Sequence, residues 1–140
     1  MPPDDDGASL GELLMRAART QRRRWREALA PWDLSPHHAR ALRVVSERDG
    51  VRLSDLAETL HIAPRSATEV ADALQARGLV ERTPDLTDRR AVLLTPTAAG
   101  RRVHAEIGAA RAADTRDLFA RLGPPDRAAL ARILHTLSQD

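Results

Sequence analysis

The sequence predicts a mainly α-helical α+β fold in which a small β-hairpin interrupts a series of helices. Apolar residues recur at helical spacing along most of the 140 residues. Two short helical segments meet at a tight turn at residues 61–63, and turn-forming residues separate two strand-like segments within residues 79–95. This length is typical of one domain that can bury a core, and we assign residues 9–140 to it.

The composition excludes several classes of protein. The chain contains no cysteine, so it can form neither a disulfide framework nor a thiolate zinc site. Residues 1–8 are acidic and lack the apolar segment of a secretion signal, and no apolar run approaches the roughly 20 residues that cross a bilayer. We therefore expect a disordered tail at residues 1–8 and a cytoplasmic protein without membrane contacts. The two tryptophans and one phenylalanine are too few to stack the bases of single-stranded nucleic acid.

Two helices are predicted before the tight turn. Ser9 and Glu12 have the spacing of a capping box, and an apolar stripe follows them for about twenty residues. Ser35 and Pro36 are residue types of an N-cap and a first helical position. They predict a second helix, which stops near the Asp-Gly pair at residues 49–50.

The next segment predicts two short helices joined by a three-residue turn. Residues 51–53 suit a very short strand, and Ser54 is placed to cap the first of these helices. Pro64 suits the first position of the second helix, which ends at Gly78. The inward-facing positions are Leu56, Ala57, Leu60, Ile62, Ala67, Val70, Ala71 and Leu74. This pattern fits both a helix-turn-helix and an ordinary αα-hairpin.

A β-hairpin is predicted directly after these helices. Residues 79–82 and 90–94 are strand-like, and residues 83–88 are turn material. A hairpin in this place is a wing, which favours the helix-turn-helix interpretation. Its tip carries Asp88, Arg89 and Arg90, and arginines on a narrow tip suit the minor groove of A·T-rich DNA. A solvated turn is the alternative.

From Leu53 to Gly100 the chain resembles the MarR family of winged helix-turn-helix regulators. The resemblance lies in LAETLHIAPRSATEVADALQARGLVER, in TPDLTDRRAVLLT with its Asp-x-Arg element, and in LTPTAAG. It implies a winged helix-turn-helix at residues 35–95, with a recognition helix at 64–77 and a wing at 79–95. It also implies dimerisation helices at residues 9–34 and 96–140.

The same resemblance implies the DNA-binding residues. On the exposed side of the recognition helix they are Arg65, Ser66, Thr68 and Glu69, and in the wing they are Asp88, Arg89 and Arg90. Arg90 is expected to enter the minor groove, and Asp88 to orient the wing arginines. Two residues depart from the family pattern: Ala63 replaces a common capping serine, and Glu69 replaces a basic or neutral residue. A glutamate can accept from cytosine N4 but repels phosphates.

The last third of the chain predicts dimerisation helices. Thr95 and Pro96 are expected to begin a helix that runs to about Leu122, and residues 123–125 interrupt it. The final helix carries an apolar stripe of Leu130, Ile133, Leu134 and Leu137. These faces exceed what one small winged domain can bury, which favours a twofold homodimer on a pseudo-palindromic operator over a monomeric helical bundle.

No pattern for catalysis, a cofactor or a metal is present. The chain lacks a glycine-rich phosphate loop, a GxSxG element and a carboxylate pair with an acid/base partner. The five histidines lack the paired spacing of a metal motif. Some relatives in the family that the chain resembles sense zinc, so a site using His37, His38 or His104 is the alternative. We expect neither catalytic residues nor a metal site.

The predicted function is sequence-specific regulation of transcription on double-stranded DNA. We expect a repressor whose DNA affinity changes when a small-molecule effector, an aromatic or phenolic compound, binds between the dimer helices and the winged domain. Trp25, Trp32, His38 and Arg40 are the expected lining groups, on similarity and chain position. The alternatives are a constitutive architectural DNA-binding protein without effector, and an enzyme or interaction module on the same fold.

Overall fold

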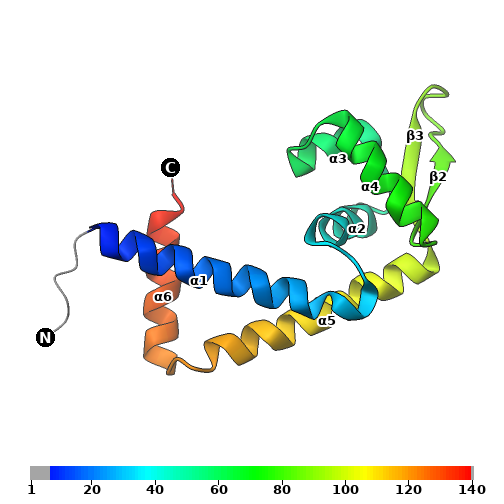
Figure 1. Ribbon diagram of the computed structural model, residues 1–140. Helices are drawn as coiled ribbons and strands as arrows, with labels where there is room; N and C mark the ends of the chain where they lie inside the picture. The colour runs from blue at the N-terminus through cyan, green and yellow to red at the C-terminus, as the bar shows by residue number, and fades with distance from the viewer. Residues whose placement is uncertain (1–6, 140) are drawn as a thin grey trace, which may run out of the picture.

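The computed structural model describes residues 7–139 and has long helices at one end and a small sheet at the other (Figure 1). In chain order the elements are α1 (Gly7–Ala28), the 3₁₀ turn η1 (Ala30–Trp32), α2 (Pro36–Arg48), β1 (Val51–Arg52), α3 (Leu53–Leu60), α4 (Pro64–Ala76), β2 (Val80–Pro84), β3 (Val92–Pro96), α5 (Ala98–Phe119) and α6 (Pro124–Leu137). The mainly helical fold with a small hairpin is confirmed. No helix in the described part of the chain is long and apolar enough to span a membrane.

The first helix starts earlier than predicted. α1 begins at Gly7, two residues before the expected cap at Ser9. The first N–H groups of any helix lack intrahelical partners, so one capping residue does not fix where the helix begins. Residues 1–6 of the predicted tail lie outside the described residues. α1 ends at Ala28, before Pro31 as expected.

The second helix confirms its predicted signals. Ser35 is extended, with φ −74° and ψ 161°, and its Oγ accepts the backbone N–H of His38 at 3.2 Å. Pro36 takes the first helical position, and Asp49 ends the helix in the left-handed region with φ 54°. Ala39, Leu42 and Val45 face the core as predicted, together with Ala41.

The helix-turn-helix is present, with one correction at its start. The prediction that Ser54 caps α3 is wrong, because α3 begins at Leu53 and Arg52 is the extended residue before it. Val51 and Arg52 pair with Leu94 and Leu93 of β3, which keeps the chain extended up to Arg52. The predicted turn is confirmed: His61 is left-handed with φ 54°, the Ile62 N–H donates to the Ala57 carbonyl at 3.0 Å, and α4 begins at Pro64.

The strands form an antiparallel sheet in the order β1-β3-β2. β2 pairs with β3 from Val80 opposite Pro96 to Pro84 opposite Val92, so the strands lie up to two residues later than predicted. The expected helix start at Thr95 and Pro96 is wrong for the same reason: pairing with β2 holds both residues in β3. α5 starts at Ala98, after Thr97, whose Oγ1 accepts the Gly100 N–H at 3.0 Å.

The core lies where α2, α3 and α4 pack on the sheet and on α5. Its largest fully buried side chains are Leu29, Leu42, Leu56, Leu74, Leu94, Val45 and Val80. α1 and α5 contact each other near the C-terminal part of α1 and diverge from there, and α6 crosses the N-terminal part of α1, far from the sheet (Figure 1). The fold thus holds α4 and the β2–β3 hairpin at one end and leaves α1, α5 and α6 to form the other.

Candidate nucleic-acid interface

The recognition helix presents a polar face to solvent. Arg65 and Glu69 lie one turn apart, and their side chains are 92% and 70% exposed, with Arg65 Nε 3.7 Å from Glu69 Oε1. Thr68 is exposed, and its hydroxyl donates to the Pro64 carbonyl at 3.2 Å. Ser66 is half-buried. The opposite face, with Ala67, Ala71 and Leu74, is buried and fixes the orientation of the helix.

Ala63 leaves the start of this helix without a side-chain cap. It is extended, with φ −63° and ψ 149°, and makes no capping hydrogen bond through its side chain. Its carbonyl still accepts the Ala67 N–H at 3.1 Å. The first turn of α4 therefore keeps polar N–H groups directed beyond the helix, where an anion can be bound.

The tip of the hairpin carries the predicted wing residues. Asp88 Oδ1 accepts the Arg90 N–H at 3.0 Å, and the Asp88 carbonyl accepts the Ala91 N–H at 3.0 Å. Asp88 therefore shapes the loop through the backbone of Arg90. Arg89 and Arg90 are exposed, and among the described residues neither side chain takes part in an ion pair within the chain.

A second carboxylate anchors the base of the same loop, and sequence reasoning missed it. Asp85 is 8% exposed, and its Oδ1 accepts the backbone N–H of Thr87 at 2.9 Å and the Thr87 hydroxyl at 2.8 Å. Its Oδ2 lies 2.6 Å from Nη2 of Arg52. The hydrogen bonds from Thr87, with a smaller contribution from Arg52, lower the pKa of Asp85 to about 2. The Asp-x-Thr spacing of an Asx-type turn was the available signal.

A cavity of 240 Å³ lies between α1, α2 and α5. α1 contributes Trp25, and the remaining lining residues are Pro36, Ala39, Arg40 and Arg43 of α2 with His104, Ile107, Gly108 and Arg111 of α5. The guanidinium carbon of Arg111 lies 4.7 Å from the centroid of the Trp25 ring. The cavity thus combines an aromatic surface with three arginines, a lining suited to an anionic aromatic molecule.

Comparison with known proteins identifies the family. Residues 34–92 match the family model described as "MarR family". The HTH-type transcriptional repressor Rv2887 of Mycobacterium tuberculosis is 33% identical over 96% of this chain and 97% of its own length. The chain belongs to the MarR family.

Solved structures of MarR-family proteins share the fold. The crystal structure of Rv2887 superposes with a TM-score of 0.78 at 29% identity, over 96% of this chain and 97% of that one. The YusO protein of Bacillus subtilis gives 0.83 at 22% identity over 99% of both chains. A mutant MarR of Escherichia coli, complexed with operator DNA, gives 0.76 at 23% identity, over 93% of this chain and 94% of that one.

Only part of the predicted effector site lines the cavity of this MarR-family chain. Trp25 and Arg40 are in the lining, whereas Trp32 and His38 are not. Residues two apart on a helix point in nearly opposite directions, so His38 and Arg40 cannot share one face of α2. His38 is half-buried, and burial, with the charges of Arg77 and His37, lowers its pKa. The Trp32 indole N–H instead donates to Glu106 Oε2 at 3.1 Å.

The cavity also contains a residue that the sequence suggested only in connection with zinc. His104 lies in the lining, next to the arginines of α2 and α5. Within residues 7–139, no group of three or more His, Asp or Glu side chains could hold a metal ion. His104 therefore stands in the lining together with Ile107 and Gly108 of α5.

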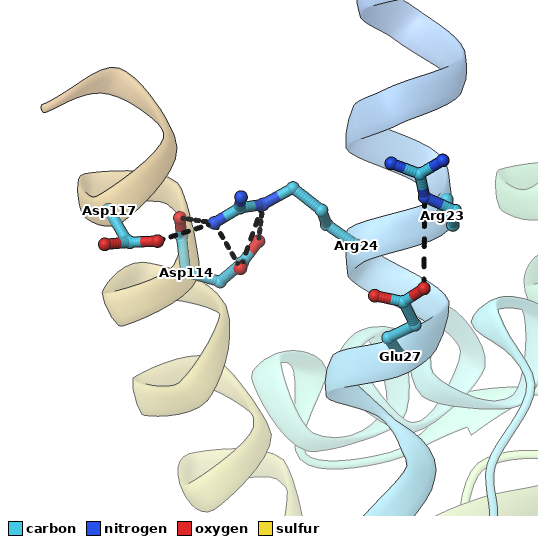
Figure 2. A network of polar contacts seen from close by, with 5 residues as sticks. All are labelled: Arg23, Arg24, Glu27, Asp114 and Asp117. Atoms are coloured by element: carbon cyan, nitrogen blue, oxygen red, sulfur yellow. Dashed lines mark hydrogen bonds and ion pairs between the residues drawn. The ribbon is translucent and has the colours of Figure 1, made fainter. Parts of the chain in front are cut away.

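An ion-pair cluster joins the two long helices of the MarR-family fold. Arg24 of α1 reaches α5, where its Nη2 lies 2.8 Å from Asp114 and 3.0 Å from Asp117 (Figure 2). The hydrogen bonds that Arg24 donates to these carboxylates raise its pKa. The neighbouring Arg23 points along α1 to Glu27, 3.9 Å away (Figure 2). Within this arginine-rich stretch, Arg24 thus fixes the α1–α5 pair.

The long helices also leave apolar side chains in solvent. A groove of 470 Å³ runs between α1, the end of α5 and α6. Its apolar lining includes Leu13, Leu14, Leu118, Phe119, Leu122, Leu130 and Leu134. Beside it, Leu10, Met15, Ile133 and Leu137 are 52%, 50%, 46% and 66% exposed. An apolar surface of this extent is typical of a protein interface.

Proposed function

We propose that this protein is a transcriptional repressor that binds a pseudo-palindromic operator in double-stranded DNA as a homodimer and responds to a small-molecule effector. The mycobacterial relative Rv2887 is named a transcriptional repressor, and a structure of a mutant Escherichia coli MarR contains operator DNA. The supporting observation is that α4 exposes a polar face beside a projecting hairpin, and that the two arginines at the hairpin tip, Arg89 and Arg90, have no ion-pair partner among the described residues.

Each DNA-contacting element has a distinct task in this proposal. α4 enters the major groove, where Arg65, Ser66, Thr68 and Glu69 meet base edges and phosphates. Because Glu69 neutralises Arg65 in the free protein, binding requires Arg65 to exchange this pair for a guanine or a phosphate. Arg90 enters the adjacent minor groove, Arg89 lies beside it, and Asp88 holds the Arg90 backbone in place.

Replacing Arg90 with alanine is expected to weaken operator binding most where the flanking sequence is A·T-rich. A narrow A·T-rich minor groove concentrates negative potential, so a lost arginine costs about 1 to 3 kcal/mol there and less on G·C-rich flanks. Fluorescence anisotropy with both kinds of operator measures the difference. Arg19→Ala, which removes one exposed arginine from α1, is the matched control and should not change the dependence on flanking sequence.

Two results would contradict this assignment. Equal binding by wild type and Arg90→Ala on every operator excludes the wing from the interface. If the affinity of the wild type hardly depends on the half-site sequence, the protein is better explained as a constitutive architectural DNA-binding protein. A repressor must discriminate its operator from other sites.

The dimer is proposed from the apolar groove between α1, α5 and α6. Two copies that pack these faces together bury the side chains that one copy leaves in solvent. We expect the wild type to sediment as a dimer at micromolar concentration and Leu134→Glu, in the groove, to shift it toward monomer. Leu86→Glu, on a wing residue that is 98% exposed, is the matched control. A monomeric wild type removes the basis of the proposal.

The effector is proposed to occupy the cavity beside Trp25 as an aromatic or phenolic anion. α2 lines the cavity and also packs against α4, so a ligand that moves α2 biases the spacing of the recognition helices. Titration of Trp32→Phe with benzoate should change Trp25 fluorescence and release operator DNA, and Arg40→Ala should weaken both effects. Arg48→Ala, on α2 but outside the lining, is the control. If benzoate binds but the affinity for operator DNA stays unchanged, the cavity is not an effector site.

A further inference from the structure

The outer part of the wing has little support from the rest of the fold. β1 pairs with β3 only at Val51–Leu94 and Arg52–Leu93, and beyond this point the two-stranded ribbon of β2 and β3 extends by one further pair, Pro84 and Val92. Such a ribbon is weakly held and twists easily. The loop at residues 85–91 that carries the arginines lies at its far end. The orientation of these arginines therefore depends on the contacts that hold this loop against the helix-turn-helix.

A single charged contact ties the loop to the helix-turn-helix. Asp85 Oδ2 accepts from Arg52 Nε at 2.8 Å and lies 2.6 Å from Arg52 Nη2. Arg52 is the last residue of β1 and directly precedes α3, so it belongs to the helix-turn-helix. Across the described residues, no other ion pair or side-chain hydrogen bond links residues 85–91 to an element outside the wing.

The other atoms of Asp85 organise the loop itself. Oδ1 holds Thr87 through both its backbone N–H and its hydroxyl, and the Asp85 N–H donates to the Ala91 carbonyl at 3.1 Å. Asp88 then holds the Arg90 N–H. These contacts form a continuous path from Arg52 to the backbone of Arg90. Asp85 is also buried, although the side chain of its partner Arg52 is 40% exposed.

We propose that Asp85 is a positioning residue for DNA binding, which ties the wing loop to Arg52 and thereby directs Arg90 toward the minor groove. This inference rests on the proposed DNA-binding function. The partner of the wing is duplex DNA, which Arg90 contacts at the minor groove and which Asp85 itself does not touch.

The sign of the expected effect separates positioning from simple electrostatics. An aspartate near DNA repels phosphates, so removing its charge alone should strengthen binding to every sequence. Loss of the Asp85–Arg52 contact predicts weaker binding instead, because a wing that twists freely loses conformational entropy when it becomes ordered on DNA. It also predicts that the loss is concentrated on operators with A·T-rich flanks, where the wing arginine contributes most.

The test uses Asp85→Asn, Arg52→Gln and the double variant. Asparagine retains an oxygen for Thr87 but loses the charge that faces Arg52, so it isolates the tie. Asp114→Asn, which weakens the Arg24 ion pair between α1 and α5, is the matched control. Binding is measured on A·T-flanked and G·C-flanked operators, thermal unfolding is followed in parallel, and hydrogen exchange of the wing peptide is measured without DNA.

Each single variant should bind the A·T-flanked operator about tenfold more weakly, as expected for the loss of one charge-assisted hydrogen bond. The double variant should be no weaker than Arg52→Gln alone, because both substitutions break one contact. Exchange at residues 84–92 should accelerate in all three, whereas Asp114→Asn should resemble the wild type in exchange and in flank dependence.

Three results would overturn the inference. They are unchanged exchange in the wing, stronger binding of Asp85→Asn to all operators, and a uniform loss of binding that follows the melting temperature. If the wild type binds no operator, the proposed function fails by itself. In that case faster exchange in the variants still shows that Asp85 orders the wing, and unchanged exchange refutes the tie as well.

Discussion

Replacing Gly100 with alanine is expected to destabilise the protein by about 3 kcal/mol, in the range of severe overpacking. A Cβ atom on Gly100 would lie 1.9 Å from the carbonyl oxygen of Leu79 and 2.9 Å from its carbonyl carbon. Both are backbone atoms, so no side-chain rotation relieves the clash. The first turn of α5 must move away from the start of β2.

The surrounding contacts oppose that movement. The Thr97 N–H donates to the same Leu79 carbonyl at 3.1 Å, and the Thr97 hydroxyl donates to the Gly78 carbonyl at 2.6 Å. Urea denaturation at a fixed protein concentration, followed by circular dichroism, measures the decrease in the free energy of unfolding. The matched control is Gly108→Ala, on the same helix with no atom near its Cβ position. Stability of Gly100→Ala close to that of Gly108→Ala would refute the close approach of α5 to Leu79.

Truncating Leu42 to alanine is expected to cost about 2 to 5 kcal/mol, the range found for buried leucines. Leu42 is fully buried at the middle of α2, which packs against α3, α4, α5 and the sheet. These elements are tied by backbone pairing and helix contacts, so they cannot collapse fully into the space left by the side chain.

Leu86→Ala provides the same chemical change on an exposed side chain. Leu86 is 98% exposed, and substitution there should alter the free energy of unfolding by no more than about 0.5 kcal/mol. Chemical denaturation of both variants under identical conditions compares them directly. A cost for Leu42→Ala as small as that for Leu86→Ala would mean that α2 does not lie in the core.

Features encoded within a few neighbouring residues were predicted well. Ser35 with Pro36 marked the start of α2, and Pro64 marked the start of α4, because capping depends on side chains next to the helix end. The turn at residues 61–63 was also correct, since one left-handed residue ends α3 there. The presence of the wing followed from its strand-like segments and turn residues.

The boundaries that failed are those set by pairing with distant strands. The pairing of β1 with β3 keeps the chain extended up to Arg52, so α3 begins at Leu53. The pairing of β3 with β2 places Thr95 and Pro96 in the sheet instead of in a helix. For a related reason, the sequence did not show which of the expected effector-site residues line the cavity. Trp25 and Arg40 both line the cavity, whereas Trp32 and His38 do not, and the packing of α1, α2 and α5 decides this.

The sequence by itself determined the helical class, the helix-turn-helix with its wing, the MarR resemblance and the exposure of Arg65, Thr68 and Glu69 on α4, because these depend on local periodicity, capping and turn chemistry. It did not show that Ser66 is half-buried. The tertiary structure alone decided that Arg52 meets Asp85, that Arg24 joins Asp114, and that Gly100 touches the Leu79 backbone. Each of these contacts joins residues more than about 20 positions apart. The pairing of the strands and the crossing of the helices decide which residues meet in these contacts. Both depend on the packing of the whole chain, so no local sequence pattern predicts them.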